Sequence, residues 1–198
     1  MKRLFDFLMS LIAIILLSPV ILIVALAVKF TSPGPILFKQ RRIGKDNVEF
    51  EIYKFRTMRI DTPNVPTHLL ENPEQWTTTI GKFLRKTSLD ELPQLFNILK
   101  GEMSIVGPRP ALYNQLDLKE MRTKVGVHKL VPGLTGWAQI NGRDEIPLRL
   151  KVDLDKEYLE RKSFFFDIKI IFMTVLSVLK SDGVQEGKSE NNNETDTV

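Results

Sequence analysis

The sequence predicts a membrane-anchored α/β protein of irregular architecture, mostly helical with a short β-hairpin. The first observation is an almost wholly apolar segment from Leu4 to Phe30. The second is that helical periodicity dominates the remainder, whereas strand-like alternation is brief. The third is that 198 residues with 43% hydrophobic and 26% charged positions are ordinary for one globular domain. We therefore expect a membrane hairpin over residues 1–30, a catalytic domain over 31–184 and a disordered tail over 185–198, which is too polar to form a core.

Basic residues are concentrated around the apolar segment. Residues 1–60 hold ten basic and four acidic side chains, so the net positive charge of the chain lies there, and the remainder is net negative. Next to a membrane segment, this charge favours anionic lipid or an anionic membrane substrate over nucleic acid. No cysteine and two histidines exclude disulfides, thiolate zinc sites and cysteine nucleophiles, and they argue against a Ser-His triad. No glycine-rich nucleotide-binding motif supports an ATPase or dinucleotide enzyme.

The apolar segment has three interpretations. A cleaved signal peptide fits poorly, because the segment is long and has a proline at its centre. A straight spanning helix would place one basic flank outside the cytoplasm, although both flanks prefer the inside. A helix broken at Ser18-Pro19 keeps both flanks inside, and its arms of about eleven residues reach about 16 Å, half of a ~30 Å hydrocarbon core. We favour this re-entrant helix-break-helix, and a proline-kinked spanning helix stays open.

The next elements are a hairpin and a short helix. After a turn-rich stretch over 31–35, alternating runs over Ile36–Phe38 and Val48–Phe55 predict two strands that flank a basic loop over 41–47. Residues 61–75 show no periodicity and predict a loop. Thr79–Leu84 predicts a short helix.

A second helix is predicted around residue 95. Leu92, Leu95, Phe96 and Leu99 form one apolar helical face, and Gly101 can end the helix. Its start has the spacing of a capping box, with Ser88 and Glu91 as the pair.

The C-terminal third predicts a short strand and two further helices. Met103–Val106 reads as a strand entering a loop at 107–110, and a second glycine-rich loop covers 131–143. Leu148–Leu159 has a helical pattern. Phe164–Leu179 has too few uninterrupted apolar positions to span a bilayer, so we expect an interfacial amphipathic helix or a core helix.

Candidate chemistry centres on Asp90 and Glu91. Adjacent carboxylates at a helix start can hold Mg²⁺, next to N–H groups that bind phosphate, although capping alone would also explain them. Arg85, Arg109 and Arg143 suggest a polyanionic ligand, because the guanidinium fork matches phosphate oxygens. Each arginine taken singly could be ordinary surface charge.

A second acidic pattern is Asp153-Leu154-Asp155. It matches the Asp-x-Asp pattern of many nucleotide-sugar glycosyltransferases, but it lies within a helical run instead of at a strand end. We therefore interpret it as a solvated helix face.

Five ordered blocks carry a resemblance to a known family. The sequence resembles the bacterial sugar transferases, the monotopic phosphoglycosyl transferases, over the blocks Phe38–Lys45, Tyr53–Met58, Arg85–Leu95, Gly101–Pro110 and Pro132–Arg143. Without a preceding multi-span region, the chain is similar to the small members that transfer bacillosamine-type phosphosugars.

The resemblance implies a reaction and a location. It implies transfer of a phosphosugar from a UDP-sugar to polyprenol (undecaprenyl) phosphate with release of UMP, at the cytoplasmic face of the bacterial inner membrane. Asp90 would be the nucleophile that forms a covalent phosphosugar adduct, and Glu91 would support Mg²⁺ or the second substrate. The remaining implied roles are phosphate binding by Arg85, Arg109 and Arg143, lining of the site by Lys54 and Arg56, and a helix break at Ser18-Pro19.

Two other functions stay open at this point. A UDP-sugar hydrolase would resolve the adduct with water, and a non-catalytic membrane scaffold would use only the basic surface. The sequence does not identify the sugar, the glycan pathway or the polyprenol length, and a homodimer is compatible with it. Residues 61–75 are a hypothetical determinant of sugar specificity.

Overall fold

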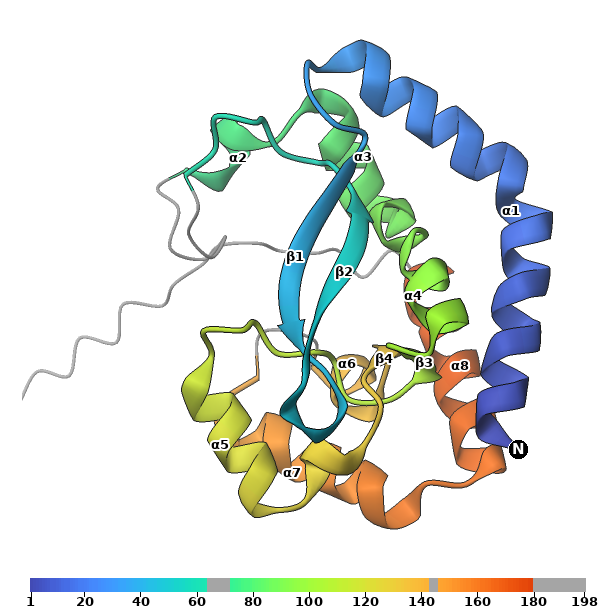
Figure 1. The fold of residues 1–198 in the computed structure, drawn as a ribbon, viewed down its shortest axis with the longest axis vertical. Coiled ribbons are helices and arrows are strands. Elements are labelled where there is room, and N and C mark those ends of the chain that lie inside the picture. Colours follow the sequence, from blue (N-terminus) through green and yellow to red (C-terminus); the bar gives the residue numbers. More distant parts are fainter. Residues whose placement is uncertain (64–71, 143–145, 180–198) are drawn as a thin grey trace, which may run out of the picture.

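The computed structural model describes residues 1–63, 72–142 and 146–179. The fold is mostly helical with a small amount of sheet, as predicted (Figure 1). The α-helices are α1 (Lys2–Thr31), α2 (Pro73–Trp76), α3 (Thr79–Thr87), α4 (Gln94–Lys100), α5 (Leu116–Lys124), α6 (Trp137–Ile140), α7 (Leu148–Arg161) and α8 (Phe164–Leu179). The strands are β1 (Leu37–Ile43), β2 (Glu49–Phe55), β3 (Ser104–Val106) and β4 (Gly133–Thr135), and the short 3₁₀ helices are η1 (Lys45–Asn47), η3 (Leu89–Glu91) and η4 (Val127–Lys129).

Helix α1 is one helix of 30 residues with Pro19 inside it. It runs along one side of the molecule and bends between its two halves (Figure 1). Proline lacks the N–H that would bond the carbonyl of Ile15, four residues earlier. The Ser18 hydroxyl donates to that carbonyl at 2.8 Å instead. The serine hydroxyl thus replaces the missing donor, and the backbone stays helical at Ser18-Pro19, where the sequence predicted a break.

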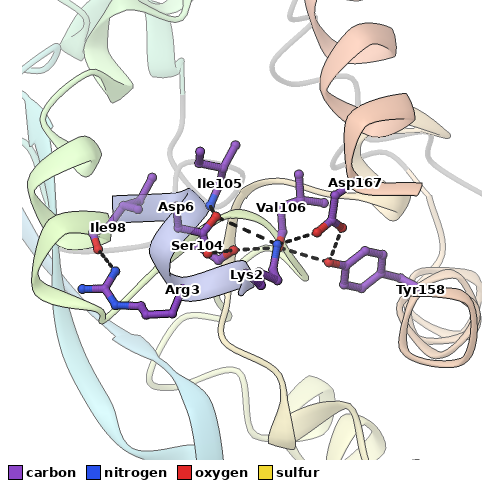
Figure 2. A network of polar contacts seen from close by, with 9 residues as sticks. All are labelled: Lys2, Arg3, Asp6, Ile98, Ser104, Ile105, Val106, Tyr158 and Asp167. Carbon is purple, nitrogen blue, oxygen red and sulfur yellow. Dashed lines mark hydrogen bonds and ion pairs between the residues drawn. The ribbon is translucent and has the colours of Figure 1, made fainter. Parts of the chain in front are cut away.

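The first turns of α1 are fixed to the domain by polar contacts (Figure 2). The buried Asp6 carboxylate accepts hydrogen bonds from the Ser104 hydroxyl at 2.8 Å and the Ile105 amide at 3.2 Å. Lys2 forms an ion pair with Asp167 of α8 at 2.7 Å. These contacts join α1 to β3 and α8.

The other end of α1 packs through apolar side chains. Val24 and Val28 are buried in one cluster with Phe55 of β2 and Leu84 of α3. Both ends of α1 therefore rest on the same folded domain.

The antiparallel hairpin β1–β2 is longer than the sequence indicated. Its register runs from Leu37 opposite Phe55 to Ile43 opposite Glu49. The predicted basic loop is therefore wrong in part, because Arg41 and Arg42 lie within β1, where strand pairing continues past the last alternating position. The connection is confined to residues 44–48.

Strand β4 was not predicted. Residues 133–135 were expected to be loop, but they pair in parallel with β3, with Ser104 opposite Gly133 and Val106 opposite Thr135. A Cβ atom at Gly133 would lie 2.1 Å from the Gly107 amide nitrogen, so this position requires glycine. The glycines that suggested a loop permit close approach of two backbones instead.

Helix α4 buries a different face from the one predicted. Leu95 and Ile98 are buried, whereas Phe96 is 42% exposed. The reason is that Asn97 turns inward to the hairpin, where it accepts from the Tyr53 amide at 3.1 Å and donates to the carbonyl of Glu51 at 2.7 Å. The ending of α4 at Gly101, with a positive φ of 89°, is confirmed.

The other predicted helices are present. Helix α3 extends from Thr79 to Thr87 and α7 from Leu148 to Arg161, each slightly beyond its predicted end, and α8 has its predicted bounds. Helix α8 contacts α1 through the Lys2–Asp167 ion pair and the Phe5–Phe164 ring pair.

Candidate functional site

The Asp90-Glu91 pair lies in the short turn η3 between α3 and α4. Ser88 adopts a left-handed conformation, with φ 56° and ψ 17°, and its amide donates to the carbonyl of Arg85 at the end of α3. Its side chain makes no capping hydrogen bond, so the predicted capping box is wrong. Ser88 ends one helix and Pro93 begins the next, which leaves the two carboxylates on a tight bend instead of in the first turn of α4.

Two cationic side chains from other segments contact the carboxylates at this bend. Lys54 extends from β2, and its Nζ lies 2.7 Å from Glu91 Oε1 and 3.8 Å from Asp90 Oδ2. Arg109 follows β3, and its Nη2 donates to the same Glu91 oxygen at 3.3 Å. Glu91 is thus held by two cations, whereas Asp90 has a longer ion pair to one of them.

The two carboxylates have opposite electrostatic surroundings. Burial raises the pKa of Asp90 above its ordinary value, and Lys54 counteracts this effect only in part. Burial also acts to raise the pKa of Glu91, but Lys54 and Arg109 together lower it to about 2. Glu91 is therefore a fixed negative charge, while Asp90 is a buried and comparatively basic carboxylate.

Arg85 of α3 also belongs to this group. Its Nε donates to the Thr57 hydroxyl at 3.0 Å, and its charge acts to lower the pKa of Asp90. Sequence reasoning missed Thr57 as a supporting residue. The available signal was its place directly after Arg56 in the Tyr53–Met58 block.

Arg56, which was expected to line the site, is buried against the segment that follows α1. This side chain is 5% exposed, and its Nη2 donates to the carbonyl and hydroxyl of Ser32 at 2.8 and 2.7 Å. Burial lowers its pKa. Its hydrogen bonds thus fix the chain directly after α1. The structure brings Lys54, Arg85 and Arg109 to the carboxylates, and Arg143 lies outside the described residues.

The expectation of a solvated Asp-x-Asp motif is wrong for one of its two carboxylates. Asp153 is exposed, but Asp155 is 1% exposed and pairs with Arg122 of α5 at 2.6 Å. The sequence signal was available, because Asp155 lies three residues after Val152 and three before Tyr158, both of which are buried on α7.

The acidic pair fits one mode of magnesium binding. Among residues 1–63, 72–142 and 146–179, no cluster of three or more His, Cys, Asp or Glu side chains could hold a metal. Mg²⁺ commonly needs only one or two carboxylates together with substrate phosphates and water. Asp90 and Glu91 are adjacent carboxylates of this kind, so their chemistry fits an ion shared with a phosphate-bearing substrate.

Large apolar side chains are exposed on α1 and on the helices that contact it. Within the described chain, α1 is the one helix long and apolar enough to cross a membrane, and it could anchor the protein there. Helices α3, α4 and α8, which contact α1, also expose large apolar groups. The exposed set includes Leu16, Ile23, Phe30, Phe83, Phe96, Phe165 and Phe172.

Fold and site together define a membrane-associated protein in which two carboxylates and three cationic side chains form a site suited to phosphorylated ligands. The chain belongs to the bacterial sugar transferase family, whose model matches residues 1–181.

Related proteins from several bacteria show substantial identity. The chain is 44% identical over 183 residues to the UDP-glucose:undecaprenyl-phosphate glucose-1-phosphate transferase of Escherichia coli (strain K12), covering 88% of this chain and 39% of that protein. It is 43% identical to the uncharacterized sugar transferase EpsL of Bacillus subtilis (strain 168), over 94% of this chain and 91% of EpsL. It is 38% identical to the UDP-N-acetylgalactosamine-undecaprenyl-phosphate N-acetylgalactosaminephosphotransferase of Aeromonas hydrophila, over 93% of this chain and 45% of that protein. The chain thus spans less than half of two of these relatives and nearly all of the third.

Proposed function

We propose that this protein transfers a phosphosugar from a UDP-sugar to undecaprenyl phosphate, releases UMP and thereby begins the assembly of a membrane-bound glycan. The observation that carries the proposal is the buried Asp90 carboxylate beside the Lys54–Glu91–Arg109 ion network. Relatives named as UDP-sugar:undecaprenyl-phosphate transferases support it.

The first chemical step is nucleophilic attack by Asp90. An Oδ atom forms a bond to the β-phosphorus of the UDP-sugar, and the bond from that phosphorus to the bridging oxygen breaks, so UMP leaves with the electron pair. A covalent intermediate divides one difficult displacement into two easier ones. The raised pKa of Asp90 fits this role, because a more basic carboxylate is a better nucleophile once it is ionised.

The second step regenerates the carboxylate. A phosphate oxygen of undecaprenyl phosphate attacks the same phosphorus, and the Asp90 oxygen leaves with its electrons. The products are the free enzyme and a polyprenyl diphosphosugar. Arg85, Arg109 and Lys54 supply fixed positive charge for the phosphoryl oxygens in both steps.

Glu91 has a supporting role in this scheme. Its ion pairs with Lys54 and Arg109 hold both cations beside Asp90. Together with Asp90 and the substrate diphosphate it would hold Mg²⁺, which supplies further charge neutralisation when bound.

The packing of α1 supports a re-entrant arrangement at the cytoplasmic face. Asp6 near one end and Val28 near the other contact the same domain, so a domain on one side of the bilayer places both ends of α1 there. The basic flanks favour the cytoplasmic side. The exposed aromatic residues of α3, α4 and α8 then lie at the interface, where an active site meets both a soluble donor and a lipid phosphate.

Intact-mass analysis tests the reaction. Purified protein in lipid nanodiscs is incubated with Mg²⁺ and a panel of UDP-sugars, without lipid acceptor. A mass increase of one phosphosugar with near-stoichiometric UMP is expected for the wild type and for Asp153→Asn, whose side chain is exposed, and no increase is expected for Asp90→Asn.

The other outcomes distinguish the alternatives. Turnover with undecaprenyl phosphate but without an adduct would replace the covalent step by direct transfer. Free sugar phosphate without acceptor would indicate a hydrolase. The absence of both an adduct and turnover would contradict the proposed function and favour a scaffold.

Cysteine labelling tests the arrangement of α1, because the chain has no cysteine of its own. Leu4→Cys and Lys45→Cys introduce single thiols at exposed positions near either end of the membrane segment. Both are expected to resist an impermeant thiol reagent in intact cells and to react after lysis. Labelling of one alone in intact cells would establish a spanning helix.

A further inference from the structure

The loop that carries Arg109 is held through its carbonyl groups. Four consecutive carbonyl oxygens each accept a hydrogen bond: Pro108 from the Gly133 amide at 2.9 Å, Arg109 from Arg122 Nη1 at 2.8 Å, Pro110 from Arg42 Nη1 at 3.0 Å, and Ala111 from the Ile43 amide at 2.9 Å. Prolines 108 and 110 have no N–H, so the loop can be fixed on these positions only through its carbonyls.

The Arg109 carbonyl depends on a buried ion pair. Arg122 of α5 is 7% exposed, and its Nε and Nη2 both donate to Asp155 Oδ2, at 2.9 and 2.6 Å. Its Nη1 is the group that reaches the Arg109 carbonyl. Asp155 therefore sets the orientation of the guanidinium, and the guanidinium sets the position of the loop.

This chain of contacts ends at the reacting groups. From the backbone held by Arg122, the side chain of Arg109 reaches Glu91, the neighbour of Asp90. Replacing a buried ion pair by apolar groups is often neutral for stability, so stability alone is a weak reason for this one. Catalysis, in contrast, is sensitive to an error of about 1 Å in the position of a charged group.

We propose that Arg122, oriented by Asp155, is a positioning residue that fixes the Arg109 backbone and so aims the Arg109 guanidinium at the substrate diphosphate. This inference rests on the proposed function. Asp155 thus serves the transfer reaction through two arginines, without contacting substrate or metal.

A kinetic double-mutant cycle tests the proposal. Arg122→Lys keeps the positive charge beside Asp155 but loses the fork that reaches two partners. It is expected to lower kcat/KM for the UDP-sugar by about tenfold to a hundredfold. In an Arg109→Ala background the same change is expected to lower kcat/KM by less than about twofold, because the guanidinium that Arg122 positions is already absent. Asp155→Asn should behave like Arg122→Lys, and Asp153→Asn like the wild type.

Hydrogen exchange supplies a readout independent of activity. The Ile43 and Gly133 amides donate to the same loop, so peptides containing them should exchange faster in Arg122→Lys. The Tyr53 amide, which donates to Asn97, serves as the control and should be unchanged.

The outcomes separate this inference from the proposed function. Equal losses of kcat/KM in both backgrounds, or unchanged exchange of the loop amides, would show that the ion pair only stabilises the fold. An inactive wild type with every donor would overturn the proposed function, and with it the positioning role, whatever the exchange experiment shows about the loop.

Discussion

Asp90 and Glu91 are adjacent in the sequence, but their surroundings shift their pKa values in opposite directions. The difference follows from geometry, since the Glu91 carboxylate contacts Lys54 and Arg109 closely while Asp90 is buried with one longer ion pair. Burial of Asp90 thus costs folding free energy, and the ion pairs of Glu91 return part of that stability.

The two carboxylates should therefore respond oppositely to neutralisation in the metal-free protein. The protonated form of Asp90 contributes stability that is lost as pH rises through its raised pKa, so Asp90→Asn should raise Tm at pH 7. The ionised form of Glu91 contributes stability that is lost as pH falls from its unfolded pKa toward about 2. Glu91→Gln should accordingly lower stability at pH 7 by roughly 1–3 kcal/mol.

Thermal melts in detergent with EDTA, from pH 3 to pH 8, measure both effects. The deficit of Glu91→Gln should shrink toward the acidic end, as should the gain of Asp90→Asn. Two variants that shift Tm in the same direction at pH 7 would contradict the electrostatic difference.

Gly34 supports the environment of Arg56. Its φ of 117° strains any residue with a side chain, and a Cβ would lie 2.2 Å from Arg56 Nη1 and 2.6 Å from the Ile60 side chain. Gly126 has a φ of 79°, but a Cβ there would meet only Leu159 at 3.8 Å. Both alanine variants should lose about 1–2 kcal/mol from backbone strain, and Gly34→Ala should lose about 1–3 kcal/mol more from overpacking.

Chemical unfolding of the two variants measures this difference. Equal losses would show that the Arg56 side chain moves aside without cost, which would contradict a fixed guanidinium after α1.

At the scale of elements, the sequence predicted what depends on local periodicity. Helices α7 and α8, the hairpin and the ending of α4 at Gly101 follow from spacing within one segment. Strand β4 does not, because its pairing with β3 joins residues 29 positions apart, such as Ser104 and Gly133. The false capping box has the same origin, since Ser88 is used by the end of α3.

The candidate site could likewise be predicted only where it depends on local sequence. Family resemblance and local chemistry pointed to Lys54, Arg85, Asp90, Glu91 and Arg109, which the fold brings together. Helical spacing from Val152 indicates that Asp155 is buried, but no local pattern identifies Arg122, on a separate helix, as its partner.

Helix α1 offers a prediction at this scale. Ser18→Ala removes the hydroxyl that bonds the Ile15 carbonyl, which Pro19 leaves without its usual amide donor. In an apolar environment an unsatisfied carbonyl costs about 1–3 kcal/mol, so Ser18→Ala should lower Tm in nanodiscs. In a Pro19→Ala background the amide of residue 19 can bond the same carbonyl, and Ser18→Ala should then be nearly neutral. Equal losses of Tm in the two backgrounds would show that the hydroxyl does not compensate for the proline.

At the scale of the whole molecule, the membrane helix and the site share one support. Asp6 of α1 binds β3 at Ser104 and Ile105, and β3 leads directly to the loop of Arg109. The Tyr158 hydroxyl of α7 donates to Asp167 at 2.7 Å and lies 3.2 Å from the carbonyl oxygen of Val106, so α1, α7 and α8 meet around this one strand (Figure 2). Movement of the first half of α1 would therefore displace β3 and, with it, the loop that carries Arg109.

Asp6→Ala tests this connection. It leaves the Ile105 amide without its acceptor, which should cost about 1–3 kcal/mol, while the buried Ser104 hydroxyl can still donate to the Val106 carbonyl at 3.0 Å. Lys2 pairs closely with Asp167, at 2.7 Å, and only at 4.0 Å with Asp6, and its side chain is 43% exposed, so Lys2→Met should cost about 1 kcal/mol or less. Hydrogen exchange in nanodiscs should show faster exchange of the first turns of α1 and of β3 in Asp6→Ala, together with a lower kcat/KM, and only slight changes in Lys2→Met. If Asp6→Ala instead loosens α1 while β3 and kcat/KM stay at wild-type values, the anchor and the site are energetically independent, and the shared strand does not couple them.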